Sequence, residues 1–217
     1  MPTHVVAQGD CIASIADRYG FHDPAALFDH ADNAALKALR KLGSVLLPGD
    51  RVVIPERAEK WQESCATGKV HSFTLKRPVV HLRVLVRWTN GDPIAGKRYV
   101  LKVEGRPDVE GTTGSDGLVE AEVPAAALRG EIHVHWDGAD VNWPLVLPVH
   151  IGHLDPLDTP TGVQGRLANL GYGCEITGEL ADTRDALAAF QREEGLEPTG
   201  ELDDKTRDAL RSRHEGF

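Results

Sequence analysis

Near its C-terminus the chain contains the same phrase twice. "TGELADTRDAL" begins at Thr177 and "TGELDDKTRDAL" begins at Thr199, and the second copy has one additional residue. In each copy a glycine follows the threonine and permits backbone angles closed to other residues, so the pair predicts a turn. An aspartate then stands where a helix N-cap is expected, Asp182 or Asp203, and good helix formers follow. The repeat therefore predicts two short helices with the same kind of start.

The apolar residues of this region have the spacing of small amphipathic helices. A third helix is predicted over "GVQGRLANLGYG", before the first copy, and Gly195 stands where a C-cap glycine is expected. The residues predicted to face inward are Val163, Leu167, Leu170, Ala186, Leu187, Phe190, Thr206, Ala209 and Leu210. Three small helices around one apolar centre make a domain of about fifty residues, near the lower limit for folding alone.

Residues 162–213 resemble the three-helix peptidoglycan-binding domain of bacterial cell-wall hydrolases. The matching residues are Leu170-Gly171-Tyr172, Phe190-Gln191 and Gly195-Leu196. In place of the family's two Asp-Gly turns this chain has Thr177-Gly178 and Thr199-Gly200, which keeps the turn geometry and removes the carboxylate. The resemblance implies peptidoglycan binding, with Tyr172 and Gln191 among the contacting residues.

The N-terminal segment predicts the order strand, helix, helix, strand. The strand "HVVAQ" stops at Gly9, and apolar residues at helical spacing then run from Ile12 to Gly20. A second helix is predicted over "DPAALFDHA", with Asp23 as its cap and Pro24 in its first turn. The second strand lies within "PGDRVVIP", where the flanking prolines limit its length.

This segment resembles the LysM module, which binds glycans that contain N-acetylglucosamine, such as peptidoglycan and chitin. The matching residues are Gly9-Asp10, Ile15-Ala16, Tyr19-Gly20, Asn33, Leu47, Pro48-Gly49-Asp50 and Ile54-Pro55. The resemblance implies a shallow glycan groove with two walls. One wall would hold Gly9, Asp10, Cys11 and Ile12, and the other Leu47, Pro48 and Gly49.

Two departures from the LysM pattern bear on that groove. Cys11 replaces the usual threonine, and "ALKALRKLGSV" lengthens the route from Asn33 to the second strand and enters beside the groove. This long form is similar to LysM-like proteins encoded near contractile injection systems, type VI secretion among them. That similarity implies injection-spike or effector proteins as partners.

Between predicted linkers at 58–78 and 153–161 the apolar period changes to two. Five or more short strands are predicted, in "VVHLRVLVRW", "KRYVLKV", "LVEAEV", "EIHVHW" and "WPLVLPVHI". They make an antiparallel β-sandwich, similar in its Gly-x-Pro and Thr-x-x-Asp-Gly turns to transthyretin-like and carboxypeptidase-regulatory-like domains. The prediction is a multidomain α+β protein: a LysM-like module (1–57), a sandwich (79–152) and a three-helix domain (162–217).

The composition is that of a soluble globular protein, with 41% hydrophobic and 26% charged residues and a formal net charge of −9. No segment is basic, so we expect no nucleic-acid partner. The sequence has no run of about 18 apolar residues, so we expect no membrane span. The N-terminus lacks the pattern of a signal peptide, so we expect synthesis in the cytoplasm and, if the protein leaves the cell, delivery by an injection apparatus. The three cysteines have no paired spacing, which favours reduced thiols.

One constellation raises the question of an enzyme. His133 and His135 alternate onto one face of a strand and, with His150 and His153, could hold zinc, although a solvent-facing pair is the commoner arrangement. We expect no catalytic residues, metal or cofactor. Trp88, Trp136 and Trp143 are predicted to fill the sandwich core.

Taken together, the sequence predicts a non-catalytic modular protein that binds peptidoglycan or a related N-acetylglucosamine glycan, as an accessory, adaptor or cargo protein of a contractile injection system. Two alternatives remain. One is an interaction scaffold whose LysM and peptidoglycan-binding folds no longer bind glycan, and the other is a zinc-dependent cell-wall hydrolase.

Overall fold

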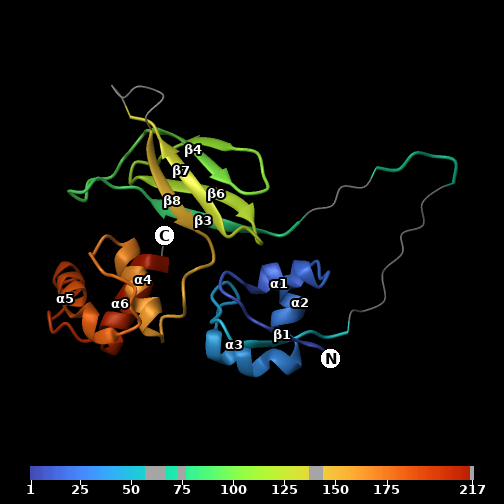
Figure 1. Ribbon diagram of the computed structural model, residues 1–217, viewed down its shortest axis with the longest axis horizontal. Coiled ribbons are helices and arrows are strands. Elements are labelled where there is room, and N and C mark those ends of the chain that lie inside the picture. The colour runs from blue at the N-terminus through green and yellow to red at the C-terminus, as the bar shows by residue number, and fades with distance from the viewer. Residues whose placement is uncertain (57–66, 73–76, 137–143, 216–217) are drawn as a thin grey trace. The chain divides into compact units, whose positions relative to one another are not determined.

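A computed structural model describes residues 1–56, 67–72, 77–136 and 144–215 of the protein (Figure 1). The chain divides into two compact units, 1–152 and 153–217. The first unit holds the predicted LysM-like module and the sandwich, and the second holds the predicted three-helix domain. The protein is of the mixed α+β class, as the sequence predicts. Among the described residues, none of the helices is both long and apolar enough to cross a membrane.

In the N-terminal part of the first unit, three α-helices and one 3-10 helix follow the first of two short strands and precede the second. In chain order the elements are β1 (Thr3–Val5), α1 (Ile12–Arg18), α2 (Pro24–Phe28), the 3-10 helix η1 (Ala31–Asn33), α3 (Ala34–Arg40) and β2 (Arg51–Val53). β1 and β2 pair antiparallel, with His4 opposite Val52. The predicted Asp23 cap is confirmed, because its carboxylate accepts the Ala25 N–H at 2.9 Å. α3 was not predicted; it lies in the lengthened segment.

The core of this part explains why the lengthened segment is helical. Ile15, Ala16, Leu27 and Val52 have no exposed surface, and Leu36 of α3 packs in the same cluster. The amide of Asn33 donates to the carbonyls of Leu27 and Val53, and its oxygen accepts the Val53 N–H. α3 is thus part of the fold, because its start is tied to β2 and its apolar side completes the core.

The rest of the first unit is an antiparallel sandwich of two sheets. Its strands are β3 (Val79–Leu85), β4 (Arg98–Val103), β5 (Val109–Thr112), β6 (Leu118–Pro124), β7 (Arg129–Val134) and β8 (Leu145–His150). β3 and β6 form one sheet, and the other has the order β5-β4-β7-β8. The five predicted strands are confirmed, whereas β5 was missed. Gly111 interrupts its apolar pattern, and the Tyr99 ring occupies the space where a Cβ at 111 would lie.

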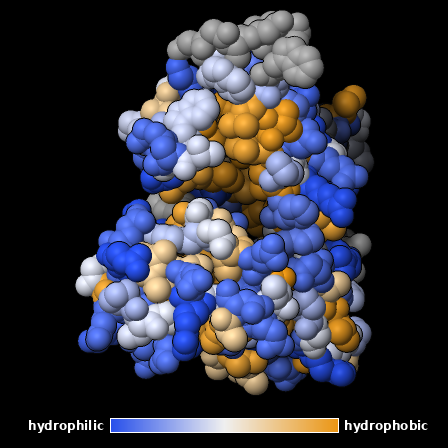
Figure 2. Space-filling view, turned by 60° about the vertical axis from the view of Figure 1, so that its left-hand side comes forward, coloured by the Kyte–Doolittle hydropathy of each residue, from blue (hydrophilic) through white to orange (hydrophobic). Residues whose placement is uncertain are grey.

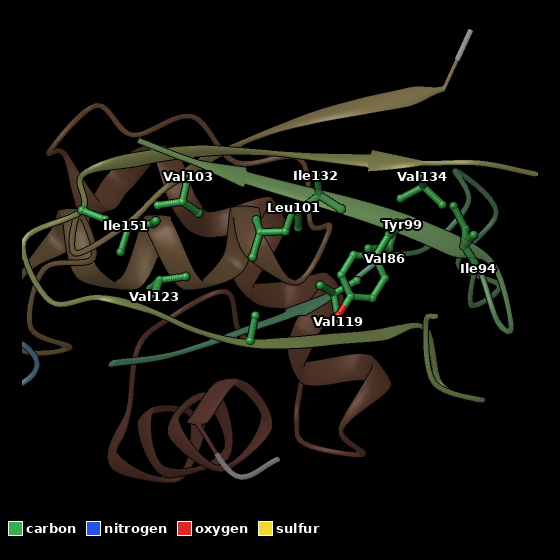
Figure 3. Packing of buried hydrophobic residues seen from close by; sticks show 12 residues of the cluster. Val86, Ile94, Tyr99, Leu101, Val103, Val119, Val123, Ile132, Val134 and Ile151 are labelled. Atoms are coloured by element: carbon green, nitrogen blue, oxygen red, sulfur yellow. The ribbon is translucent and has the colours of Figure 1, made fainter. Parts of the chain in front are cut away.

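The sandwich core lies between its two sheets. Figure 3 shows Tyr99, Leu101 and Val103 of β4 pointing toward the strand that carries Val119 and Val123. Leu101 and Ile132, which are directly opposite each other in the ladder, have no exposed surface. The alternating period predicted from the sequence therefore marks the inward residues correctly.

The prediction that the tryptophans fill this core is wrong for Trp88, which is 43% exposed and meets Trp136 edge to face. Trp136 is half-buried and does not belong to the core cluster. Trp143 lies outside the described residues. Trp88 follows β3, beyond the stretch that faces the other sheet.

On the face drawn in Figure 2 the surface is largely hydrophilic, with hydrophobic residues gathered in patches.

The second unit contains α4 (Pro160–Asn169), the 3-10 helix η2 (Leu180–Thr183), α5 (Arg184–Glu193) and α6 (Asp204–Glu215). All nine residues predicted to face inward belong to its interior. Six from the α4 and α5 regions, with Ala209 and Leu210 from α6, lie in its apolar cluster or pack against it, and Thr206 is buried. Gly195 follows α5 with a φ of 69°, as a C-cap glycine should.

The two copies of the repeated phrase begin their helices differently. Asp203 caps α6 as predicted, because its carboxylate accepts the Thr206 N–H at 2.7 Å. The prediction for Asp182 is wrong: its carboxylate accepts a hydrogen bond from Thr177, and η2 runs directly into α5. Directly after Gly-Glu-Leu the first copy has Ala181 and the second has Asp203, so only the second copy has a capping side chain at this position.

Candidate functional site

Both Thr-Gly turns of the second unit are held by a buried glutamine. In the first turn, Gln164 of α4 accepts the Gly178 N–H at 2.9 Å. Its NH₂ group donates to the Thr177 hydroxyl at 3.0 Å and to the Glu179 carbonyl at 3.1 Å. Gln164 has no exposed surface, so these bonds supply its polar atoms with the partners that burial requires.

In the second turn, Gln191 of α5 repeats the arrangement. It accepts the Gly200 N–H at 2.8 Å and donates to the Glu201 carbonyl at 2.9 Å and to the hydroxyls of Thr199 and Thr206. Gln191 is 1% exposed. The structure thus places this predicted glycan-binding residue beneath the turn, where it positions the backbone of Gly200 and Glu201; its contact with a glycan stays a prediction.

The turn held by Gln191 forms one wall of an open groove of about 470 Å³, lined by Leu180, Ala181, Arg184, Leu187, Gly200, Glu201 and Leu202. Three leucines line it; Leu180 is 39% exposed, whereas Leu187 is buried. Arg184 and Glu201 add one positive and one negative charge, with Nη2 and Oε1 3.8 Å apart. We refer to these seven residues as the turn groove.

Gly200 makes room for Arg184 in this groove. A Cβ at position 200 would lie 2.6 Å from Arg184 Cγ and 2.8 Å from its carbonyl oxygen, and the glycine has a φ of 70°. A larger residue would meet both a steric clash and an unfavourable backbone conformation. The glycine of the repeated phrase therefore sets the turn and the path of the arginine together.

Tyr172, the other residue predicted to contact glycan in this domain, lies outside the turn groove. Its hydroxyl donates to Glu193 at 2.6 Å, and its ring meets Phe190 edge to face. Burial of the ring, the hydrogen bond to Glu193 and the negative charge nearby raise the pKa of Tyr172 well above its ordinary value. Tyr172 thus has partners on α5, and its role in binding stays a prediction.

In the N-terminal part, Asp10 of the predicted LysM groove points inward. Its carboxylate accepts the Ala7 N–H at 2.9 Å, bonds to His4 at 2.9 Å and meets Arg18 at 3.1 Å. Burial alone would raise the pKa of Asp10, but the hydrogen bonds and the charge of Arg18 outweigh it and lower that pKa. Asp10 therefore braces its own loop.

The opposite loop is built in the same way. The Asp50 carboxylate accepts the Leu47 N–H at 2.9 Å and forms a bidentate pair with Arg40 of α3, at 2.7 and 2.9 Å. Both side chains of the pair are less than 10% exposed. The lengthened segment is thereby anchored directly to the loop that carries Leu47, Pro48 and Gly49, the second predicted wall.

Cys11 and Ile12 of the first wall also have partners within this part. Cys11 is the N-cap of α1: its sulfur accepts the Ser14 N–H at 3.4 Å, and Ser14 accepts the Cys11 N–H at 3.0 Å. The Ile12 N–H donates to the Gly43 carbonyl at 2.8 Å. A Cβ at position 43 would lie 3.0 Å from Ile12 Cγ1. The lengthened segment thus contacts the first predicted wall. All four residues of that wall, Gly9, Asp10, Cys11 and Ile12, are buried.

His133 and His135 are the candidate zinc ligands of the sandwich. His133 Nε2 lies 2.8 Å from Glu131 Oε2, at an exposed position. Among the described residues there is no group of three or more His, Cys, Asp or Glu side chains that could hold a metal ion. Cys11 and Cys174 are free cysteines, and Cys65 lies outside the described residues.

Comparison with known proteins found one family model that matches part of the chain. Residues 161–210 match the family model described as "Putative peptidoglycan binding domain". This span contains all of α4 except Pro160, together with η2, α5, both glutamine-held turns and all residues of the turn groove. The match supports peptidoglycan binding by the second unit. Neither the search of curated proteins nor the search of solved structures found a match to the chain.

The residues of the turn groove were missed by sequence reasoning. The repeat predicted its turns, and Gly200 and Leu202 are part of the repeated phrase, but Leu180 and Arg184 come from the other copy. A groove built across both copies becomes visible only when the packing of α5 against the second turn is known.

Proposed function

We propose that this chain is a modular protein that binds peptidoglycan through its C-terminal unit, with the turn groove as the contact site. The observation that carries this proposal is the turn groove itself, which lies wholly within the residues that match a peptidoglycan-binding family. Open grooves with apolar surface and a few charged groups are usual binding sites. The matched family is one of binding domains, so this role requires no catalytic residue.

The N-terminal part extends the proposal to a second contact. Its resemblance to LysM supports binding of N-acetylglucosamine glycans beside Cys11 and Leu47. Two weak sites on one chain would gain avidity on a polymer, because the second contact becomes intramolecular. The long form of this module supports a role as an accessory or cargo protein of a contractile injection system, which would carry the chain to the cell wall.

A second candidate is an interaction scaffold whose N-terminal module has lost its glycan groove. The contacts of the lengthened segment favour it: Arg40 pairs with Asp50 on one predicted wall, and Gly43 contacts Ile12 on the other. In that case the C-terminal unit alone would bind peptidoglycan.

Sedimentation with purified peptidoglycan tests the main proposal. We expect the full chain to pellet with the polymer and Leu180→Asp to lose most of this retention, because a charge would stand on the apolar side of the turn groove. Leu128→Asp is the matched control, since Leu128 is similarly exposed, at 42% against 39% for Leu180, and belongs to the first unit. Wild-type protein that stays in the supernatant would contradict the proposal, as would equal retention of both variants.

A further inference from the structure

The turn groove has side chains suited to a peptide. Its accessible apolar surface comes from Leu180 and Leu202, above the buried Leu187, and none of its seven lining residues is aromatic. A sugar ring offers one flat C–H face, which packs well on the flat face of an aromatic ring and poorly on branched aliphatic side chains. Alanine methyl groups, in contrast, fit between leucine side chains at little cost.

The charged residues of the groove are available to a ligand. The side chains of Arg184 and Glu201 are 70% and 75% exposed, and their charged atoms are 3.8 Å apart. A pair this exposed contributes little to stability, so a ligand can replace either partner at small cost. The guanidinium matches a carboxylate in a bidentate geometry, and the carboxylate of Glu201 matches an ammonium group.

Contacts beneath the groove fix the backbone of Glu201 and the first part of the Arg184 side chain. Gln191 holds the backbone of Gly200 and Glu201, and the absence of a side chain at Gly200 lets Arg184 cross the turn. The backbone that presents the anion and the stem of the cation are therefore positioned before any ligand arrives. Such preorganisation lowers the entropy that binding costs.

Peptidoglycan offers a ligand with this chemistry. Its peptide stem carries alanine methyl groups, free carboxylates and, at its diamino acid, an ammonium group. Its glycan strand carries acetyl and lactyl methyl groups but no ammonium group. We propose that the turn groove binds the peptide stem of peptidoglycan, with Arg184 on a free carboxylate and Glu201 on the ammonium group. This inference rests on the proposed function, because it specifies which part of the polymer the groove contacts.

Amide NMR titration of the full chain with two soluble probes tests it. The probes are a stem tetrapeptide that contains diaminopimelate, and peptide-free glycan strands. We expect the tetrapeptide to shift the amide signals of Arg184, Gly200 and Glu201, and its amidated form, which lacks free carboxylates, to bind about fivefold to tenfold more weakly. Arg184→Gln should remove the difference between the two peptides, whereas Arg192→Gln, on the same helix and outside the groove, should keep it.

The outcomes separate the inference from the function on which it rests. Groove signals that respond to glycan strands and not to the tetrapeptide would overturn the inference, as would equal binding of the acid and amidated peptides by the wild type. Retention on whole peptidoglycan with no response of the groove to either probe would also overturn it. Failure of the full chain to pellet with whole peptidoglycan would instead remove the proposed function.

Discussion

The side-chain oxygen of Gln191 accepts a 2.8 Å hydrogen bond from the backbone N–H of Gly200. Gln164 and Gly178 make the same bond at 2.9 Å in the other copy of the repeated phrase. Each glutamine comes from the helix that precedes its turn and is almost fully buried. The repeat therefore records a structural unit, in which a helix presents an amide and the following Thr-Gly turn is built around it.

Gln191→Ala should destabilise the second unit by about 3 kcal/mol. The substitution leaves the buried Gly200 N–H and Thr206 hydroxyl and the part-buried Glu201 carbonyl without their partner, and each unpaired buried group is costly. Urea unfolding followed by NMR signals of α4 to α6 measures the change. Arg192→Ala, one position along the same helix and exposed, is the control and should change stability by less than about 0.5 kcal/mol. Similar values for both variants would contradict the role assigned to Gln191.

Arg40→Ala should destabilise the N-terminal part by about 3 kcal/mol, because it leaves the buried carboxylate of Asp50 without its positive partner. Lys37→Ala is a matched control on the same helix: its pair with Asp29 is about half exposed, so its loss should cost well under 1 kcal/mol. NMR signals of Leu27 and Val52 during urea unfolding report on this part. A small effect of Arg40→Ala would mean that the lengthened segment is not anchored through this pair.

Cys11→Thr tests both the cap of α1 and the predicted glycan groove. A hydroxyl is a better acceptor than a thiol, so the 3.4 Å contact with Ser14 N–H should become a stronger cap, worth about 0.5 to 1 kcal/mol of stability. If the groove is open, the same hydroxyl should tighten chito-oligosaccharide binding by up to about tenfold. Calorimetric titration of both proteins measures this. If the wild type binds with micromolar affinity and Cys11→Thr binds equally well, the proposed effect of Cys11 is wrong.

The second unit should lose stability in mild acid through His214. Burial, and then the positive charge of Arg166, lower the pKa of His214 from 6.5 to about 4. Below pH 6.5 the unfolded chain therefore binds a proton that the folded chain excludes, so stability falls until about pH 4 and then levels off for this group. Between pH 7.5 and pH 5 the loss should be about 2 kcal/mol.

Unfolding of the second unit at these two pH values, followed by NMR, checks the prediction. His214→Gln should remove most of the difference, because glutamine does not titrate and can still accept the hydrogen bond from Asn169. A pH dependence that survives this substitution would assign the effect to other groups.

Much of the local structure could be predicted from the sequence. The Thr-Gly turns, the cap residues Asp23 and Asp203, the apolar faces of the helices and the alternating strands of the sandwich all depend on neighbours within a few residues. Turn chemistry and apolar period act over that distance, so a single chain is enough to read them. The resemblance of residues 162–213 to a peptidoglycan-binding domain could be recognised for the same reason, because its pattern is made of such turns and faces.

The tertiary structure decided what the polar side chains do. Gln191 and Asp10 were predicted to face a ligand, yet their contacts hold the chain's own backbone, because a buried amide or carboxylate must find partners within the fold. α3 depends on Leu36 reaching the core and Arg40 reaching Asp50, which no local pattern encodes. The turn groove likewise combines Arg184 of one copy of the repeat with Glu201 of the other, and their proximity follows from the packing of α5 against the second turn.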